Sequence, residues 1–223
     1  LDIRAIGSKV AEALVAQEWV KDPLDLFSLT LTQLESFRLG DEDKGARKFG
    51  KNAQTVLEAL ARAKSLTLDR WLFATGIPNV GVTVAEQIAS LHRRFSDLPD
   101  SPLLKAVVRL SECYDLAAAA NPRSTHNRPK DDAEREERTA RFNRLCGEIG
   151  VLGDTLVAAG AAAKTPGTAL PPQYVSVLKP ESARAVLDFF SSDYGRAYLA
   201  RLRELGIDPP SKPKAEAAAD TPL

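Results

Sequence analysis

Glycines that stand directly before helix-like segments are the residues of this sequence best suited to chemistry. Gly7 and Gly81 each precede an amphipathic stretch, and an alanine follows four residues later, at Ala11 and Ala85. Gly50 repeats the arrangement imperfectly. A glycine accepts a tight turn that side chains resist, and the helix start behind it presents unpaired N–H groups at the positive end of the helix dipole. The pattern predicts cradles for anions such as the phosphates of a polyphosphate backbone.

The expected phosphate contacts lie at these three helix starts. Backbone N–H groups would make most of them, with short-range charge added by two lysines. Ser8 is the predicted N-cap of a helix over residues 8–18. The predicted contact residues are Gly7, Ser8, Lys9, Gly50, Lys51, Asn52, Gly81, Val82 and Thr83.

Composition makes any nucleic-acid binding local. Lys+Arg and Asp+Glu are both 30, so the formal net charge is zero and no general basic field exists. Cys113 and Cys146 are too few for a zinc quartet or a disulfide framework, and we expect them to be small buried hydrophobes. His92 has no second histidine or cysteine pair nearby, so we expect an exposed residue at a helix end and no metal site. No apolar run approaches the roughly 20 residues of a membrane span.

Residues 101–170 differ in character from the rest. Apolar side chains recur there at alternating steps of three and four in two blocks, separated by a Pro-containing polar stretch. This spacing predicts two helices packed as an antiparallel hairpin. Three glycines weaken the second helix and predict a bend or fraying, at Gly147, Gly150 and Gly153. The basic tip is interpreted as a solvated turn, with DNA or partner contact as the alternative, through Arg123, Arg128 and Lys130.

A fourth, degenerate copy of the repeat follows the spacer KTPGTALPPQ. Lys179 stands there in the position of the glycine, so we expect this copy to keep its packing role and lose the close phosphate approach. The predicted fold is all-α: four helix-hairpin-helix motifs, the fourth degenerate, form two tandem modules with an inserted antiparallel helical hairpin. The predicted boundaries are 1–66 for the first module, 67–100 plus 171–207 for the second, 101–170 for the insertion and 208–223 for a flexible linker.

An ordered series of segments resembles the helix-hairpin-helix domain of bacterial NAD-dependent DNA ligases. One hairpin alone would be weak evidence, because many DNA repair proteins contain such motifs. The resemblance covers most of residues 1–100 and 174–210. It rests on the series LDIRAIGSKVAEALV, VKDPLDLFSLTLTQLES, NAQTVLEALARAKS, RWLFATGIPNVGVTVAEQIA and FFSSDYGRAYLARLRELGI.

This resemblance implies a part of a larger enzyme. In that family an adenylation domain, an OB-fold and a four-cysteine zinc module precede the region, and a BRCT domain usually follows. The opening at Leu1 is similar to the point just after the zinc module. The nucleophilic lysine of the family's Lys-x-Asp-Gly signature has no counterpart here, so we expect this segment to be non-catalytic and to bind no cofactor. NAD, magnesium and zinc are implied for the full-length enzyme only.

The implied role is sequence-independent binding of nicked duplex DNA while other domains of the same chain seal the nick in replication and repair. A cytoplasmic, nucleoid-associated bacterial location and no membrane partner follow from the resemblance. The sequence departs from the family's Gly-hydrophobic-Gly hairpins, because Ala5, Lys48 and Asn79 occupy the first glycine position. The insertion at 101–170 is also longer than the connector expected from the family. Its role is open between a brace between domains and an additional contact with DNA or protein.

Two other classes remain open from the sequence. One is a DNA-binding module of another repair factor, such as a nuclease subunit or a branch-point binder, since these share such hairpins. The other is a structural interaction domain in which the hairpins only pack helices. Phosphate contacts predict that log K falls with log salt by about 0.9 per neutralised phosphate, which a purely structural domain would not show.

Overall fold

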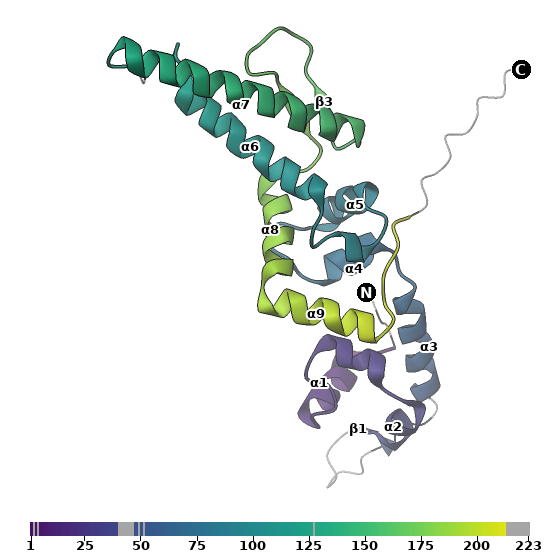
Figure 1. The fold of residues 1–223 in the computed structure, drawn as a ribbon. Helices are drawn as coiled ribbons and strands as arrows, with labels where there is room; N and C mark the ends of the chain where they lie inside the picture. The colour runs from purple at the N-terminus through teal and green to yellow at the C-terminus, as the bar shows by residue number, and fades with distance from the viewer. Residues whose placement is uncertain are drawn as a thin grey trace, which may run out of the picture.

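The computed structural model describes residues 1, 3, 5–39, 47–48, 50, 52–126 and 128–212 (Figure 1). Of the predicted contact residues, Lys51 lies outside this set. Helices dominate the described residues, as predicted. The helices are α1 (Ser8–Ala16), η1 (Pro23–Ser28), α2 (Leu31–Ser36), α3 (Asn52–Lys64), α4 (Leu68–Ala74), α5 (Val82–Leu91), η3 (Phe95–Asp97), α6 (Pro102–Ala120), α7 (Asp132–Ala158), α8 (Pro180–Ser191) and α9 (Asp193–Glu204).

Two short antiparallel ribbons correct the all-α prediction. The first pairs β1 (Arg38–Leu39) with β2 (Arg47–Lys48), and the second pairs β3 (Ala162–Lys164) with β4 (Tyr174–Ser176). Strands of two or three residues are too short to produce an alternating hydrophobic pattern, so the sequence did not reveal them. The predicted spacer KTPGTALPPQ is therefore the connection of a ribbon.

Several helices begin where the sequence places a capping residue. Each has a side-chain oxygen that accepts a hydrogen bond from a backbone N–H group of the first turn, which satisfies a donor that the helix cannot. These caps are Asp22 for η1, Thr30 for α2, Ser101 for α6, Asp131 for α7 and Ser192 for α9. The Ser8 prediction is wrong by one residue, because Gly7 is the N-cap of α1 and Ser8 is its first helical residue.

Buried hydrophobic residues form two clusters. The first core unites α1, α2 and α3 through residues such as Leu14, Leu34 and Leu60. The second core contains α4, α5, α8 and α9 and continues without a break into α6 and α7. The inserted hairpin therefore shares the second core.

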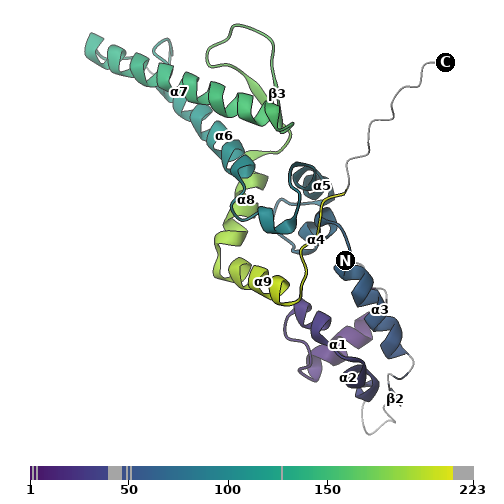
Figure 2. The same cartoon turned by 45° about the vertical axis from the view of Figure 1, so that its right-hand side comes forward.

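The inserted hairpin is antiparallel, as the seam spacing predicts. In both views α6 leads away from the rest of the molecule and α7 returns beside it, so their connecting loop lies at the far end (Figures 1 and 2). A bidentate ion pair joins the two helices, with the Nε and Nη2 atoms of Arg109 at 2.6 and 3.1 Å from the carboxylate oxygens of Glu148.

No break interrupts α7 between Asp132 and Ala158, so the expectation of a bend or fraying at its glycines is wrong. Gly153 has a packing role instead. A Cβ atom there would lie 2.3 Å from ring atoms of Tyr174, so only glycine admits the ring. Gly147 faces open space.

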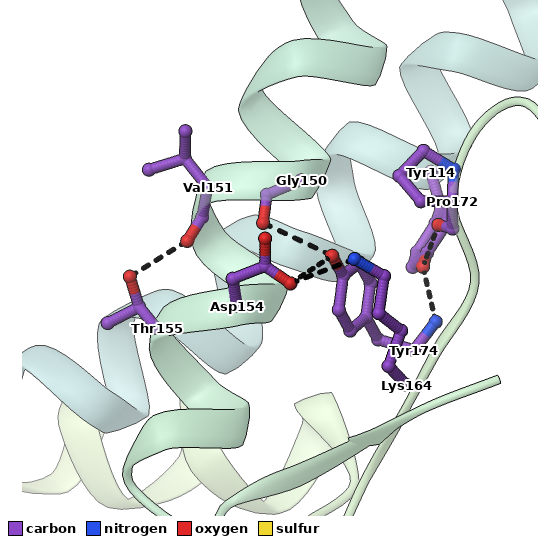
Figure 3. A network of polar contacts seen from close by, with 8 residues as sticks. All are labelled: Tyr114, Gly150, Val151, Asp154, Thr155, Lys164, Pro172 and Tyr174. Atoms are coloured by element: carbon purple, nitrogen blue, oxygen red, sulfur yellow. Dashed lines mark hydrogen bonds and ion pairs between the residues drawn. The ribbon is translucent and has the colours of Figure 1, made fainter. Parts of the chain in front are cut away.

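Tyr174 joins the second ribbon to the neighbouring helices by hydrogen bonds (Figure 3). Its hydroxyl donates to the Asp154 carboxylate at 2.7 Å, and its backbone N–H donates to the Tyr114 hydroxyl at 2.9 Å. Lys164 pairs with the same Asp154 at 3.1 Å and lies 5.3 Å from the centre of the Tyr174 ring. The ribbon is thus held to both α6 and α7.

Residues 208–212 correct part of the predicted flexible linker. Pro209 and Pro210 accept backbone hydrogen bonds from Phe95 and Leu68, at 3.0 and 2.8 Å, so this stretch is packed on the second core. The remainder of the predicted linker, 213–223, lies outside the described residues.

His92 is buried, contrary to the expectation of an exposed residue, with 8% of its surface accessible. Its Nδ1 lies 2.7 Å from the Ile88 carbonyl, and its Nε2 lies 2.6 Å from the Ser101 hydroxyl. A carbonyl can only accept, so Nδ1 carries the proton and Nε2 accepts from Ser101. Cys113 is buried as expected, and burial raises the pKa of its thiol to about 11.

Candidate nucleic-acid interface

Two turns of similar geometry lead into α1 and α5. Within the turns, Ile6 N–H donates to the Ile3 carbonyl at 2.9 Å, and Val80 N–H donates to the Ile77 carbonyl at 3.1 Å. The N-cap residue that follows is extended in both cases, with φ −74° and ψ 169° before α1 and φ −78° and ψ 179° before α5.

The helices behind these turns also correspond. The alanine N–H four residues on donates to the N-cap carbonyl, at 3.0 Å for Ala11 and 2.9 Å for Ala85. The residue seven positions after each glycine is buried, as Leu14 in the first core and Ile88 in the second. One local structure therefore occurs twice, once on each core.

The reason for glycine at these two positions differs from the predicted one. Neither φ angle lies in the left-handed region, and a Cβ added at Gly7 or Gly81 would meet nothing within 4 Å. The left-handed residue of the second turn is Asn79, with φ 63°, and asparagine tolerates this conformation better than most residues. The fold itself thus has room for a side chain at both glycines, and its absence leaves the helix starts uncovered from outside.

The first-turn N–H groups of α1 and α5 receive no side-chain cap in the described residues. In α2, α6, α7 and α9, by contrast, the N-cap side chain accepts a hydrogen bond from one of the first-turn N–H groups. Gly7, Ser8 and Lys9 are exposed at the start of α1, and Gly81, Val82 and Thr83 are exposed at the start of α5. Exposed, uncapped N–H groups at the positive end of a helix dipole can bind an anion.

Gly50 occupies a different structure. Its φ of 51° is left-handed, so here glycine does serve the backbone. The ribbon β1–β2 precedes it, and Ala53 N–H donates to its carbonyl at 3.0 Å. Asn52 is exposed at the start of α3. The third predicted site therefore shares an exposed helix start with the other two but not their turn.

The fourth copy retains the N-cap conformation without the open amides. Lys179 is extended, with φ −72° and ψ 141°, and Ala183 N–H donates to its carbonyl at 3.2 Å. Pro180 occupies the first helical position and has no N–H to offer. Ser182 donates its hydroxyl to the Asn79 carbonyl at 3.0 Å, so this helix start rests against the turn before α5. The expectation of packing without phosphate approach agrees with this geometry.

The basic tip residues lie elsewhere. Arg123, Arg128 and Lys130 are exposed in the loop between α6 and α7, at the far end of the hairpin (Figure 1). The structure does not bring them to the starts of α1 and α5.

The sequence reasoning did not single out one further polar group, the buried carboxylate of Asp69 on α4. It lines a cavity of about 630 Å³ together with Glu86, His92 and Lys212. A lone aspartate two residues after Thr67 resembles an ordinary helix-start residue, so no sequence signal marked it. Among the described residues, no group of three or more His, Cys, Asp or Glu side chains could hold a metal ion, and no helix could cross a membrane.

Comparison with known proteins places these features in context. No family model matches the sequence. A DNA ligase of Akkermansia muciniphila is 37% identical over 215 residues, which is 95% of this chain and 27% of the relative. The chain is homologous to a segment of DNA ligases. A DNA ligase of Halorhodospira halophila is 44% identical over 90 residues, which is 40% of this chain and 11% of that relative. The chain thus spans about a quarter of the length of the Akkermansia muciniphila ligase.

Proposed function

We propose that this chain is the segment of an NAD-dependent DNA ligase that holds duplex DNA by its phosphates while other segments seal the nick. Its modules would be helix-hairpin-helix units, with the starts of α1 and α5 as the principal contacts. The segment itself would be non-catalytic and bind no cofactor. NAD, magnesium and zinc would belong to the full-length enzyme, which would act in the bacterial cytoplasm at the nucleoid.

The observation that carries this proposal is the repeated glycine-started helix. Gly7 and Gly81 each leave the first-turn amides uncapped and exposed, and neither glycine is required by its turn. A phosphate oxygen needs this open approach, because a Cβ atom at the N-cap would stand beside the N–H groups. Two such starts on two cores suit a polymer that presents phosphate at regular intervals. Similarity to DNA ligases supports DNA as that polymer.

Contacts of this kind carry no sequence information. Backbone N–H groups and lysine ammonium groups bind phosphate irrespective of the neighbouring base, so the segment would position the duplex and not select a site. With a net charge of zero, affinity would come from the few local contacts and would be sensitive to salt.

The direct test uses Gly7→Ala together with Gly81→Ala. Fluorescence anisotropy would measure binding of labelled nicked and intact duplexes over a series of salt concentrations. The added methyl groups meet no protein atom within 4 Å and the φ angles suit alanine, so we expect the fold to be retained, with a loss of about 1 kcal/mol at each N-cap because glycine is favoured there over alanine. Binding should weaken about tenfold or more, by loss of charge-assisted hydrogen bonds. Gly147→Ala, on an exposed glycine of α7, is the matched control.

Equal affinity of the double variant and the parent chain would refute the amide contacts. Lys9→Glu combined with Lys51→Glu should weaken binding to all duplex sequences alike and lower the salt slope by about 0.9 for each phosphate that is no longer neutralised. A full-length ligase without this segment, supplied with NAD, should seal nicks poorly at moderate salt because it no longer holds the duplex. Undiminished sealing would contradict the role proposed here.

A further inference from the structure

Residues 208–212 form an extended segment, here called the strap, that packs against one side of the second core. Three backbone hydrogen bonds hold it: Leu68 N–H donates to Pro210 at 2.8 Å, Phe95 N–H donates to Pro209 at 3.0 Å, and Ser211 N–H donates to the Arg93 carbonyl at 2.8 Å. The strap thereby joins the start of α4 to the segment that follows α5.

Asp208 adds side-chain contacts at the beginning of the strap. Its carboxylate accepts from the backbone N–H and the hydroxyl of Ser96, at 3.0 and 3.1 Å, and pairs with Arg94 at 3.4 Å. The strap is therefore fixed at its first residue by polar contacts, and its last described residue, Lys212, enters the cavity beside α5.

The cavity contains a carboxylate that needs a cation. The Asp69 side chain is 4% exposed, and its Oδ1 atom is buried without a hydrogen-bond partner. Removing a carboxylate from water is costly unless a positive charge compensates it. Lys212 supplies that charge, with its Nζ atom 2.9 Å from Asp69 Oδ2.

A second carboxylate widens the site. Glu86 Oε1, from α5, lies 3.8 Å from the same Nζ atom. Glu86 is about half exposed, so its side chain forms the outer wall, and Asp69 forms the inner one. Two carboxylates from neighbouring helices, one of them buried and incompletely bonded, converge on a cleft with room for an ammonium group that donates three hydrogen bonds.

We propose that the cleft between α4 and α5 is a binding site for a primary ammonium group, and that its resident occupant is Lys212 of the chain's own strap. Asp69 is the receptor, and Glu86 guides the ammonium from the solvent side. The site is independent of the proposed DNA contacts.

Occupancy of this cleft fixes the position of Lys212 along α5. The cleft follows the second half of α5, because Glu86, Ala89 and Ser90 line it, whereas Gly81 precedes the first residue of that helix. A helix of ten residues is about 15 Å long at 1.5 Å per residue. Lys212 is therefore held toward the opposite end of α5 from the helix start proposed to bind phosphate, and both sites can be occupied at once.

The test compares three variants of the 223-residue chain by native-state hydrogen exchange. Lys212→Met leaves a buried carboxylate without its cation, so exchange of the Ser211 N–H group should accelerate about tenfold or more, because the strap opens more often. Asp69→Asn together with Lys212→Met should exchange more slowly than Lys212→Met alone, since a neutral amide no longer demands a cation.

Lys105→Met is the matched control, because Lys105 pairs with the exposed Asp100 and should leave Ser211 exchange unchanged. Thermal unfolding of the same set provides a second readout if Lys212→Met also lowers global stability, and the double variant should then recover part of that decrease. Unchanged exchange in Lys212→Met would overturn the assignment of the occupant. Identical behaviour of Lys212→Met and the double variant would overturn the role of Asp69.

Discussion

Alanine at two glycines of α7 should have opposite effects on stability. Gly153→Ala places a methyl group 2.3 Å from the ring of Tyr174, closer than any real contact, whereas Gly147→Ala places one in open space. Both variants add the same atoms to the same helix. The difference between them isolates the packing of the second ribbon.

The magnitudes follow from the surroundings of each position. Alanine is favoured over glycine in a helix by up to about 1 kcal/mol, and Gly147→Ala should realise most of this gain. Gly153→Ala receives the same gain but forces the Tyr174 ring away from α7. Overpacking typically costs about 1–3 kcal/mol, and displacing the hydroxyl from Asp154 costs about 1 kcal/mol more. We expect a net loss of about 1–3 kcal/mol, and therefore a difference between the two variants of about 2–4 kcal/mol.

Urea unfolding followed by circular dichroism measures both free energies of unfolding. In the double variant Gly153→Ala/Tyr174→Ala most of the clash should be absent, because the ring that meets the new methyl group has been removed. Stabilisation by both single alanine variants would show that the ring is not packed against Gly153, and the reasoning would fail.

Two further predictions concern the second core. Burial lowers the pKa of His92 below its ordinary value of 6.5 and outweighs the Ile88 carbonyl and Asp97, which raise it. Between the two pKa values, His92 binds a proton in the unfolded chain but not in the folded chain. The free energy of unfolding should therefore fall as pH drops through 6.5 toward the folded pKa. Urea unfolding between about pH 8 and about pH 5 checks this, and His92→Gln should flatten that part of the profile. Trp71→Phe removes a fully buried indole whose Nε1 donates to the Ala63 carbonyl at 3.0 Å. It should cost about 1–3 kcal/mol in the same assay, against less than about 0.5 kcal/mol for the half-exposed Phe73→Leu, and equal losses would contradict the packing described.

Local patterns predicted the helices and the antiparallel hairpin well. Seam spacing depends on residues three and four apart, and such neighbours meet on a helix whatever the rest of the chain does. Leu145 and Ile149, which belong to the second of the two apolar blocks in residues 101–170, are buried. The repeated turns were also visible, because Gly7 and Gly81 are followed by equivalent residues at equal spacing.

Contacts between distant residues were not predictable in this way. Gly153 appeared to be a weak point of a helix, because nothing in its neighbourhood of the sequence announces the Tyr174 ring that fills its place. Asp69 and Lys212 come from opposite parts of the chain, and each alone resembles a solvated surface residue. His92 was misassigned for a related reason, since its ring contacts Ser101, the cap of another helix, which the periodicity of its own helix does not reveal.

The sequence pattern selected Gly7 and Gly81 for a conformational reason that the structure does not support. A tight turn that side chains resist was expected at each glycine, but neither glycine has a left-handed φ angle and neither has a neighbouring atom that a Cβ would meet. Glycine at these positions avoids no strain and no clash within 4 Å, and its known benefit to the fold is the preference for glycine over alanine at an N-cap. Under the proposed function, an open approach for phosphate is a second benefit, and comparing the affinity of the alanine variants with their stability separates the two effects.

The two helix starts belong to different cores, so their joint use depends on how those cores are connected. The short helix η1 makes that connection. Leu24 is buried in the second core although the chain around it belongs to the first, and the Phe27 ring lies 5.4 Å from the Trp71 ring. Ser28 accepts a hydrogen bond from Arg201 of α9 at 2.7 Å. Apolar, aromatic and polar contacts thus hold one helix between the cores. Under the proposed function, a duplex bound at one helix start would meet the second at a raised effective concentration. Two contacts of modest affinity would then give a high overall affinity.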